Sequence, residues 1–312
     1  MASQRMTDLM NASSSFLDFS THLADQRAPR IVIFGAGHGS TYPGMDTSGY
    51  ALAAAAIRTA SKAGVQDVEN WDFDLGGPLF HGWPGCCVDW GDVQTKMHDN
   101  AANRSGIETK TRAALASPAV PVLIGGDCSV TFPFLAGFKD YGPIWVLQID
   151  AHIDWRDEIA GERYGSSSPM RRASEMPHVA GIVQVGLRGV GSARTSDVED
   201  ALRYGSRFVT SRDIHADGVE GALQHIPEGA RVVVTLDCDS IDPGYMPGVM
   251  ARTPGGLTYL HVIDLIARLG RRAKIAGFDL VEYYPPADID GISAIVAARI
   301  VTNVIGSIVR QG

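Results

Sequence analysis

The chain has 312 residues, of which 45% are hydrophobic and 20% are charged, and its formal net charge at pH 7 is −8. This composition excludes a disordered or fibrous chain and allows one large core. The acidic balance argues against a nucleic-acid surface, because no basic cluster stands out beyond Arg171–Arg172 and Arg271–Arg272.

Cysteine use and apolar runs bear on the compartment. Cys86, Cys87, Cys128 and Cys238 show neither a C-x-x-C spacing nor a disulfide framework. The first 30 residues lack the apolar centre of a signal peptide, and we see no run of about 18 apolar residues that would predict a transmembrane helix. We therefore expect a cytoplasmic protein without a membrane partner.

Strands and helices are predicted to alternate along most of the chain. Residues 1–29 form a polar lead-in, with a short helix expected around 15–24. Apolar runs predict strands at 30–35, 120–126, 144–150, 181–190, 207–214, 231–237 and from 274. Helices are predicted at 50–64, 93–116, 130–139, near Pro169, at 258–269 and at 288–309, whereas 65–95 is predicted to be irregular. This alternation indicates an α/β fold with a mostly parallel sheet, as one domain over 30–312.

Chemically active side chains follow several of these strands. Asp150, His152 and Asp154 come directly after one strand, and Asp237 and Asp239 after another. Parallel sheets bind ligands at the carboxyl ends of their strands, where these groups would converge. Because buried carboxylates repel one another unless they are paired, the pattern predicts a site for one or two divalent metal ions.

A glycine-rich loop follows the first predicted strand. Residues 35–40 do not satisfy G-x-G-x-x-G, and no P-loop lysine follows, which argues against nucleotide binding. His38 lies in this loop. It becomes a candidate only if the loop faces the site.

Three segments together resemble the arginase/agmatinase (ureohydrolase) family. They are GGDCS at 125–129, DAHID at 150–154 and LDCDSIDPGYMPG at 236–248, and the match extends to TPGGLTY at 253–259, VEYYPP at 281–286 and the segment 42–58. The similarity covers most of 30–309 and is nearer to the agmatinase branch. It implies a three-layer α/β/α sandwich, a single catalytic domain over 30–312 and a homo-oligomer, either a trimer or a hexamer.

The resemblance also implies a centre of two divalent metal ions, usually manganese. By position, Asp150 and Asp237 would bridge both ions, and the remaining ligands would be Cys128 and Asp154 for the first ion and His152 and Asp239 for the second. A bridging hydroxide would attack a guanidinium carbon and release urea and an amine. Glu282 would pair with the guanidinium, and Asp242 would support the loop or a ligand from outside the centre.

Two positions depart from the family pattern. Cys128 stands where the family has histidine; as a ligand it would favour zinc, nickel or iron, and otherwise it is a packed bystander. Tyr164 stands where the family has a histidine that shuttles protons, and a phenol of pKa near 10 is a poor shuttle at neutral pH. Either another group such as His38 serves, or the leaving group differs from a simple alkylamine.

The loop after DAHID offers further candidates for substrate contacts. Trp155 could line a cation pocket or simply pack in the core. Arg163 and Glu162 could contact the far end of the substrate, together with Tyr164. An arginine there would suit a substrate carboxylate, whereas agmatine would not need one.

Three functions are compatible with these residues. The first is a metal-dependent amidinohydrolase acting on agmatine or a guanidino acid. The second is the same chemistry on a formimino group, and the third is a catalytically weak homologue with a binding or assembly role. The metal content of the purified protein separates the third from the others, because the binuclear reaction needs two ions per chain.

Overall fold

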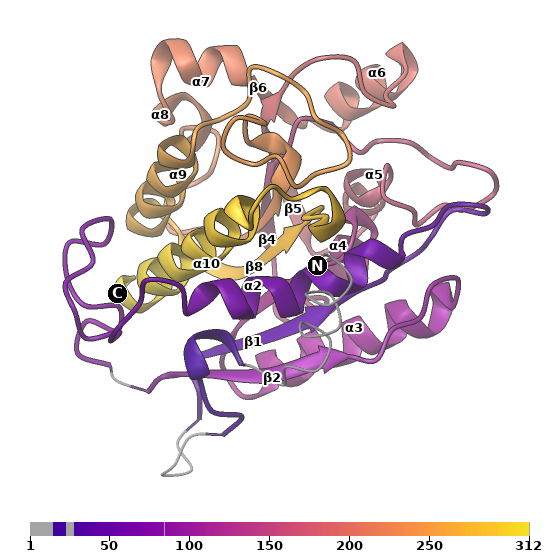
Figure 1. Cartoon of the computed structure of the whole chain (residues 1–312). Helices are drawn as coiled ribbons and strands as arrows, with labels where there is room; N and C mark the ends of the chain where they lie inside the picture. The colour runs from indigo at the N-terminus through magenta and orange to yellow at the C-terminus, as the bar shows by residue number, and fades with distance from the viewer. Residues whose placement is uncertain (1–14, 23–27, 84, 312) are drawn as a thin grey trace.

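The computed structural model describes residues 15–22, 28–83 and 85–311 (Figure 1). Within them, eight parallel strands form one sheet in the order β2-β1-β3-β8-β7-β4-β5-β6. The strands are β1 (Ile31–Ala36), β2 (Cys87–Val93), β3 (Val120–Ile124), β4 (Ile144–Ile149), β5 (Val179–Leu187), β6 (Arg207–Thr210), β7 (Arg231–Asp237) and β8 (Lys274–Val281).

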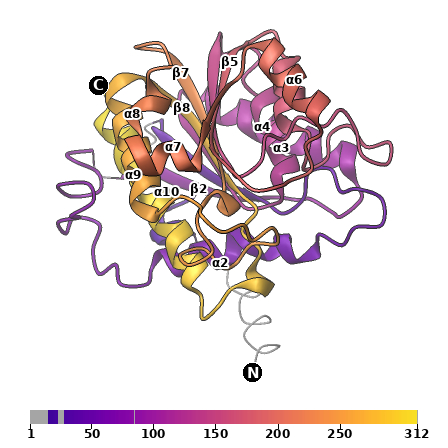
Figure 2. The same cartoon turned by 90° about the horizontal axis from the view of Figure 1, so that it is seen from above.

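The central strands are apolar on both faces because helices cover both sides of the sheet. One face carries α2 (Ala53–Ser61), α7 (Ser211–Asp217), α8 (Glu220–Leu223), α9 (Tyr259–Arg272) and α10 (Ile292–Arg310). The other carries α3 (Asn100–Ala116), α4 (Thr131–Ala136), α5 (Pro169–Ser174) and α6 (Thr195–Tyr204). Figure 2 shows α9 and α10 on one side of the sheet and α3, α4 and α6 on the other. The predicted three-layer sandwich is confirmed.

The helix α9 illustrates why these segments are helical. Its buried residues Val262, Leu265, Ile266 and Leu269 recur at helical spacing and form one apolar stripe. The Thr258 hydroxyl accepts the His261 backbone N–H at 3.1 Å and caps the amino end. The helix therefore begins at its cap and packs its stripe on the sheet.

Helix α10 corrects our expectation about apolar runs. By length and composition it could cross a membrane, although we saw no such run in the sequence. Of its most apolar window, 78% is buried inside the fold. Helices at the core of globular proteins have the same composition, because they are surrounded by other elements.

Several predicted boundaries were wrong. The segment 65–95 is not irregular throughout, since β2 pairs with β1 at the edge of the sheet. The strand predicted at 207–214 ends at Thr210, whose hydroxyl accepts the Asp213 N–H and starts α7. The helices predicted from 93 and 288 begin at Asn100 and Ile292.

The lead-in packs against the sheet where it is described. Phe16 is fully buried, and its N–H donates to Asp89 Oδ2 at 2.8 Å. A short helix was expected at 15–24, but the described residues form one 3-10 turn, η1 (Phe16–Asp18). The part of this prediction that falls on residues 23–24 lies outside the described residues. The domain boundary at residue 30 stays a prediction.

The strand order brings four sequence-distant strands to the centre of the sheet. The neighbours β3, β8, β7 and β4 all point the same way. From β4 the chain moves outward to β5 and β6 and then returns to β7 on the other side of β4. Such a reversal opens a crevice at the carboxyl ends of the strands.

Candidate active site and metal centre

Each central strand delivers a polar side chain to this crevice. Cys128 opens the short η3 (Cys128–Val130) after β3, and Asp150 directly follows β4. Asp237 ends β7, and Glu282 directly follows β8. The structure thus brings together the four groups that the sequence places just after apolar strands.

A glycine allows the tight turn before Cys128. Gly126 has a φ of 86°, and a Cβ there would lie 2.7 Å from the Ala36 carbonyl oxygen. Only glycine adopts this conformation at so short a distance without strain. Its own carbonyl accepts the Glu282 N–H at 2.9 Å, which joins the ends of β3 and β8.

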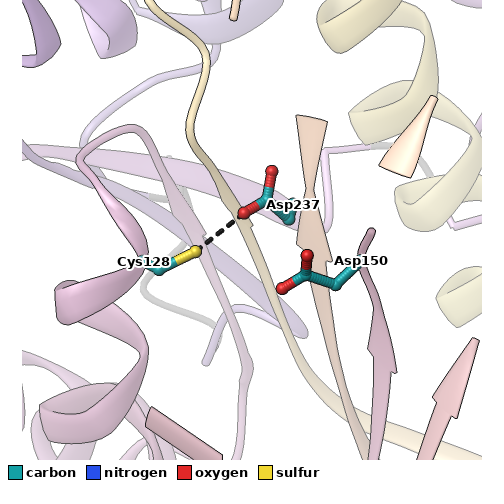
Figure 3. Close-up of side chains that lie close together, drawn as sticks. All are labelled: Cys128, Asp150 and Asp237. Atoms are coloured by element: carbon teal, nitrogen blue, oxygen red, sulfur yellow. Dashed lines mark hydrogen bonds between the residues drawn. The ribbon is translucent and has the colours of Figure 1, made fainter. Parts of the chain in front are cut away.

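Two compact groups of metal-binding side chains lie at this edge. Cys128, Asp150 and Asp237 are all buried and offer ligand atoms within 4.8 Å of one another (Figure 3). Asp150, His152 and Asp239 form the second group by the same measure. Asp150 belongs to both, so the donor set fits two adjacent divalent cations.

The charges of this cluster also call for cations. Burial, followed by the neighbouring carboxylates, raises the pKa of Asp237 well above its usual value. Hydrogen bonds to Asp150 and Asp239 raise the pKa of His152 to about 11. A protonated His152 would be the cationic partner of Asp150 and Asp239, and metal binding at its ring nitrogen would release the proton.

Cys128 is tied to the carboxylates as a thiol. Its Sγ–H donates to Asp237 Oδ2 at 2.8 Å (Figure 3). Burial, followed by Asp237, raises the pKa of this thiol. Ligation would require loss of this proton to the metal.

Asp154 lies beside both groups but belongs to neither compact set. Its φ of 47° is a left-handed conformation that costs energy for a residue other than glycine. Burial, followed by Asp150, raises the pKa of its carboxyl. Its ligand role and the bridging role of Asp237 stay predictions.

A chain of amides behind the cluster fixes its orientation. Gln148 on β4 donates from Nε2 to Asp150 Oδ2 at 2.6 Å and to Asp154 Oδ2 at 3.2 Å. The Gln148 oxygen accepts from Gln184, and the Gln184 oxygen accepts the Ser206 hydroxyl at 2.8 Å. Each acceptor sets the direction of the next amide, so the nitrogen of Gln148 faces the carboxylates.

Glu282 is positioned by two donors. The Tyr50 hydroxyl donates to Oε2, and the Cys128 N–H donates to Oε1 at 2.9 Å. Burial, followed by Asp127, raises the pKa of Glu282 to about 8. The residue holds a left-handed φ of 62°, so the surrounding fold stabilises a strained conformation at this point.

These side chains open into a cavity of about 370 Å³. Its wall includes Cys128, His152, Asp154, Asp237, Asp239 and Glu282. Hydroxyl and apolar side chains complete the wall toward solvent. The volume suits a small molecule.

A larger cavity of about 440 Å³ lies elsewhere and includes none of these groups. Among its charged residues, Arg299 pairs with both Asp72 and Asp74. We therefore assign the chemistry to the smaller cavity.

Four sequence-predicted residues, Trp155, Arg163, Tyr164 and His38, are not among the described residues of the cavity wall. Trp155 is 2% exposed and packs on the Tyr204 ring. Arg163 is exposed and pairs with Asp157 at 3.2 Å. The substrate contacts expected of Trp155 and Arg163 stay predictions.

Tyr164 and His38 make their contacts with other side chains of the protein. The Tyr164 ring packs between Phe132 and the Arg104 guanidinium, which is 4.5 Å from the ring centroid. His38 is buried with Nδ1 3.3 Å from the Thr47 hydroxyl. Burial lowers the pKa of His38. Their roles in proton transfer stay predictions.

The long loop after β7 is held from two sides. The Asp242 carboxylate accepts the backbone N–H groups of Gly244, Gly255 and Gly256 at 2.8–3.1 Å. The Arg188 guanidinium donates to several backbone carbonyls of the same loop, including that of Asp239. Asp242 thus supports the loop, as expected.

Sequence reasoning missed several residues of the site. Tyr50, Tyr42 and Asp127 line the cavity, and Gln148 lies directly behind it. Tyr42 and Tyr50 fall within the segment 42–58, which resembles the family but shows no pattern that assigns them a role. The sequence periodicity does not predict the roles of Tyr42 and Tyr50, because their contacts with the site form only in the folded chain.

Comparison with known proteins shows which family model and which proteins this chain resembles. Residues 29–306 match a family model described as the arginase family. Arginase from Medicago truncatula is 35% identical over 59% of this chain and 54% of its own length. Proclavaminate amidinohydrolase from Streptomyces clavuligerus is 33% identical over 69% of this chain and 70% of its own.

The structural comparison extends over nearly the whole fold. The structure of the Streptomyces clavuligerus amidinohydrolase aligns with a TM-score of 0.83 at 27% identity, covering 97% of this chain and 99% of the other. In sequence, the chain spans 54% to 66% of the length of the first curated relatives it matches.

Proposed function

This chain belongs to the arginase family, and from that premise we propose that it is a metal-dependent amidinohydrolase that converts a guanidino compound to urea and an amine. One observation carries the proposal. Two groups of metal-binding side chains share Asp150 and open, with Glu282, into one cavity. A reaction that needs cations and a guanidinium partner finds both kinds of residue there.

The proposed centre would hold two divalent ions. Cys128, Asp150 and Asp237 would hold one, and Asp150, His152 and Asp239 the other. When bound, the ions would lower the pKa of a shared water, so that a nucleophile is present near neutral pH. The family resemblance favours manganese, and the sulfur of Cys128 favours a softer ion such as zinc.

Glu282 is proposed to orient the substrate. A carboxylate can accept two parallel N–H donors from a planar guanidinium, which fixes the carbon that is attacked. Burial, first of all, holds the pKa of Glu282 at about 8, and a bound guanidinium would favour its ionised form. Tyr50 and the Cys128 N–H keep both oxygens in place.

The overall reaction balances without a further reactant. Water adds its oxygen to the guanidinium carbon, and the bond from that carbon to the substituted nitrogen breaks. In the net balance both protons of the water end on the substituted nitrogen, so the products are urea and an alkylammonium ion. The substituted nitrogen must gain a proton as it leaves, as general-acid catalysis requires.

The test combines metal analysis with product release. We expect two divalent ions per chain and urea from at least one guanidino compound when manganese, zinc or nickel is supplied. Glu282→Gln should abolish urea release while keeping the metal. Fewer than about one ion per chain, or no urea with any compound and metal, would refute the proposal.

The role of Cys128 has a separate spectroscopic test. Cobalt-loaded protein should show a thiolate-to-cobalt charge-transfer absorption if the sulfur is a ligand. Cys128→Ser should remove it, whereas Cys87→Ser, at a buried cysteine on β2, should leave it unchanged. An identical spectrum in Cys128→Ser would make Cys128 a packed bystander.

A further inference from the structure

The residues that line the cavity fall into two chemical groups. We call the acidic and metal-binding group the floor of the cavity and the remaining group its outer wall. Besides the metal-binding and acidic residues, the lining consists of hydroxyl and apolar side chains, among them Met45, Val190, Met250 and Ser192. Among the described wall residues there is no lysine or arginine. The floor carries five carboxyl groups, those of Asp127, Asp154, Asp237, Asp239 and Glu282. A carboxylate on the tail of a ligand, away from the metal-binding side chains, therefore finds no lysine or arginine among the described lining residues.

The mouth of the cavity is apolar and open. Met45 is 49% exposed, Met250 is 62% exposed and Val190 is fully exposed. All three line the same cavity, so they form one cluster of exposed apolar side chains. Such clusters mark places where a ligand or partner is bound. Methionine side chains are flexible and adapt to apolar ligands of differing shape.

Arginines adjacent to the wall use their donors within the protein. Arg156 donates to the Ser192 carbonyl at 2.9 Å and lies 3.5 Å from the Asp197 carboxylate. Arg252 follows Ala251 but donates to the carbonyls of Pro247 and Ala287 at 2.7 and 2.8 Å. Neither arginine is among the described residues that line the cavity.

Two further arginines near the wall are also engaged. Arg104 donates to the Ser40 hydroxyl at 2.7 Å and covers the Tyr164 ring, so it reaches the wall only through that hydroxyl. Arg163, a sequence candidate for binding a substrate carboxylate, pairs with Asp157 outside the cavity. A carboxylate tail would have to be desolvated without a matching charge, which is costly.

We infer that the substrate is a guanidino compound whose tail carries no carboxylate and places its apolar carbons against Met45, Val190 and Met250. This inference rests on the proposed function. The guanidinium end would lie at the acidic floor, and the tail would extend to the mouth. The site would discriminate against guanidino acids by the lack of a cationic partner for their carboxylate rather than by shape.

The test compares compounds of equal chain length that differ only at the tail. Urea release is measured on metal-loaded protein with butylguanidine, agmatine and guanidinobutyrate. We expect kcat/KM for the first two to exceed that for guanidinobutyrate by at least about 10-fold. Equal or higher kcat/KM for guanidinobutyrate would overturn the inference and leave the proposed function intact. No urea from any compound would refute both.

A matched pair of variants tests the wall itself. Met250→Lys places a cation at the mouth, and Met250→Gln changes the same side chain without adding charge. The lysine variant should gain at least about 10-fold in kcat/KM for guanidinobutyrate relative to butylguanidine, and the glutamine variant should not. If neither variant alters the ratio, Met250 does not contact the tail and the inference fails.

Discussion

Replacing Gln148 by leucine tests how far the proposed metal centre depends on the residues behind it. The change removes an amide that donates to Asp150 at 2.6 Å and to Asp154 at 3.2 Å. Leucine has a similar volume, so the packing between β4 and its neighbours is largely kept. The two carboxylates lose the donor that fixes their rotamers.

The magnitude follows from the two hydrogen bonds to carboxylates that the leucine variant cannot make. Hydrogen bonds to charged groups contribute about 1.5–3 kcal/mol each, and part of this is recovered when the carboxylates bind a metal instead. Loss of an outer partner of a metal ligand typically weakens metal binding by about 10- to 100-fold. We therefore expect Gln148→Leu to lose about 1.4–2.7 kcal/mol of metal-binding free energy.

The assay is calorimetric titration of chelator-stripped protein with zinc or manganese. Gln224→Leu is the matched control, because Gln224 is exposed and its amide donates to the nearby Gly221 carbonyl, away from the cluster. The control should bind metal like the parent protein. If Gln148→Leu also did so, within about twofold, the amide chain would have no role in positioning the ligands.

Three further predictions concern other buried groups. Tyr50→Phe removes the hydroxyl that donates to Glu282, so kcat/KM in the urea assay should fall at least about 10-fold. Arg58→Met should lose about 3–5 kcal/mol of unfolding free energy in urea denaturation, because Asp89 loses its bidentate buried partner. Burial raises the pKa of Asp279 to about 7, above its unfolded value of about 4. The folded state then binds the extra proton, so stability falls as pH rises from about 4 to about 7. Asp279→Asn should therefore be the more stable protein at about pH 8 in denaturation experiments, with the difference shrinking toward pH 4.

Each of these has an outcome that contradicts it. For Arg58, the control is Lys62→Met, which breaks an ion pair with the exposed Asp18, and a loss no larger than in this control would refute the buried-pair argument. An unchanged kcat/KM in Tyr50→Phe would mean that the Cys128 N–H alone positions Glu282. A stability difference for Asp279→Asn that is independent of pH would show that the Asp279 carboxyl does not titrate over the pH range of the experiment. That result would refute the argument.

The central sheet was predictable because its strands are apolar on both faces. The run at 231–237 is buried from Val232 onward, and no helical period competes with it. The edge strand β2 was missed, because CVDWGDV carries two acids and a glycine and is ordered by pairing with β1. At 207–214 the capping residues Thr210 and Asp213 were present in the sequence but were outweighed by the apolar residues before them.

The same distinction holds for the residues of the site. Those that follow a predicted strand could be predicted, and those placed by tertiary packing could not. Asp150 and Asp237 could be found because they follow strands whose ends meet by topology alone. Tyr50 reaches Glu282 across 232 positions of sequence, and such a contact depends on how a helix packs. Trp155 shows the converse, since it follows Asp154 in sequence and yet turns into the core.

The adjacency of β3, β8, β7 and β4 would link metal binding at the proposed centre to the stability of the whole fold. The groups at their ends come from distant parts of the chain, and the Cys128–Glu282 contact alone spans 154 positions. An unfolded chain cannot hold these donors together, so ions at the proposed centre would bind the native state selectively. By mass action, ions at 100 times their dissociation constant would add about 2.7 kcal/mol to the unfolding free energy. The melting temperature of this protein should therefore report the free metal concentration.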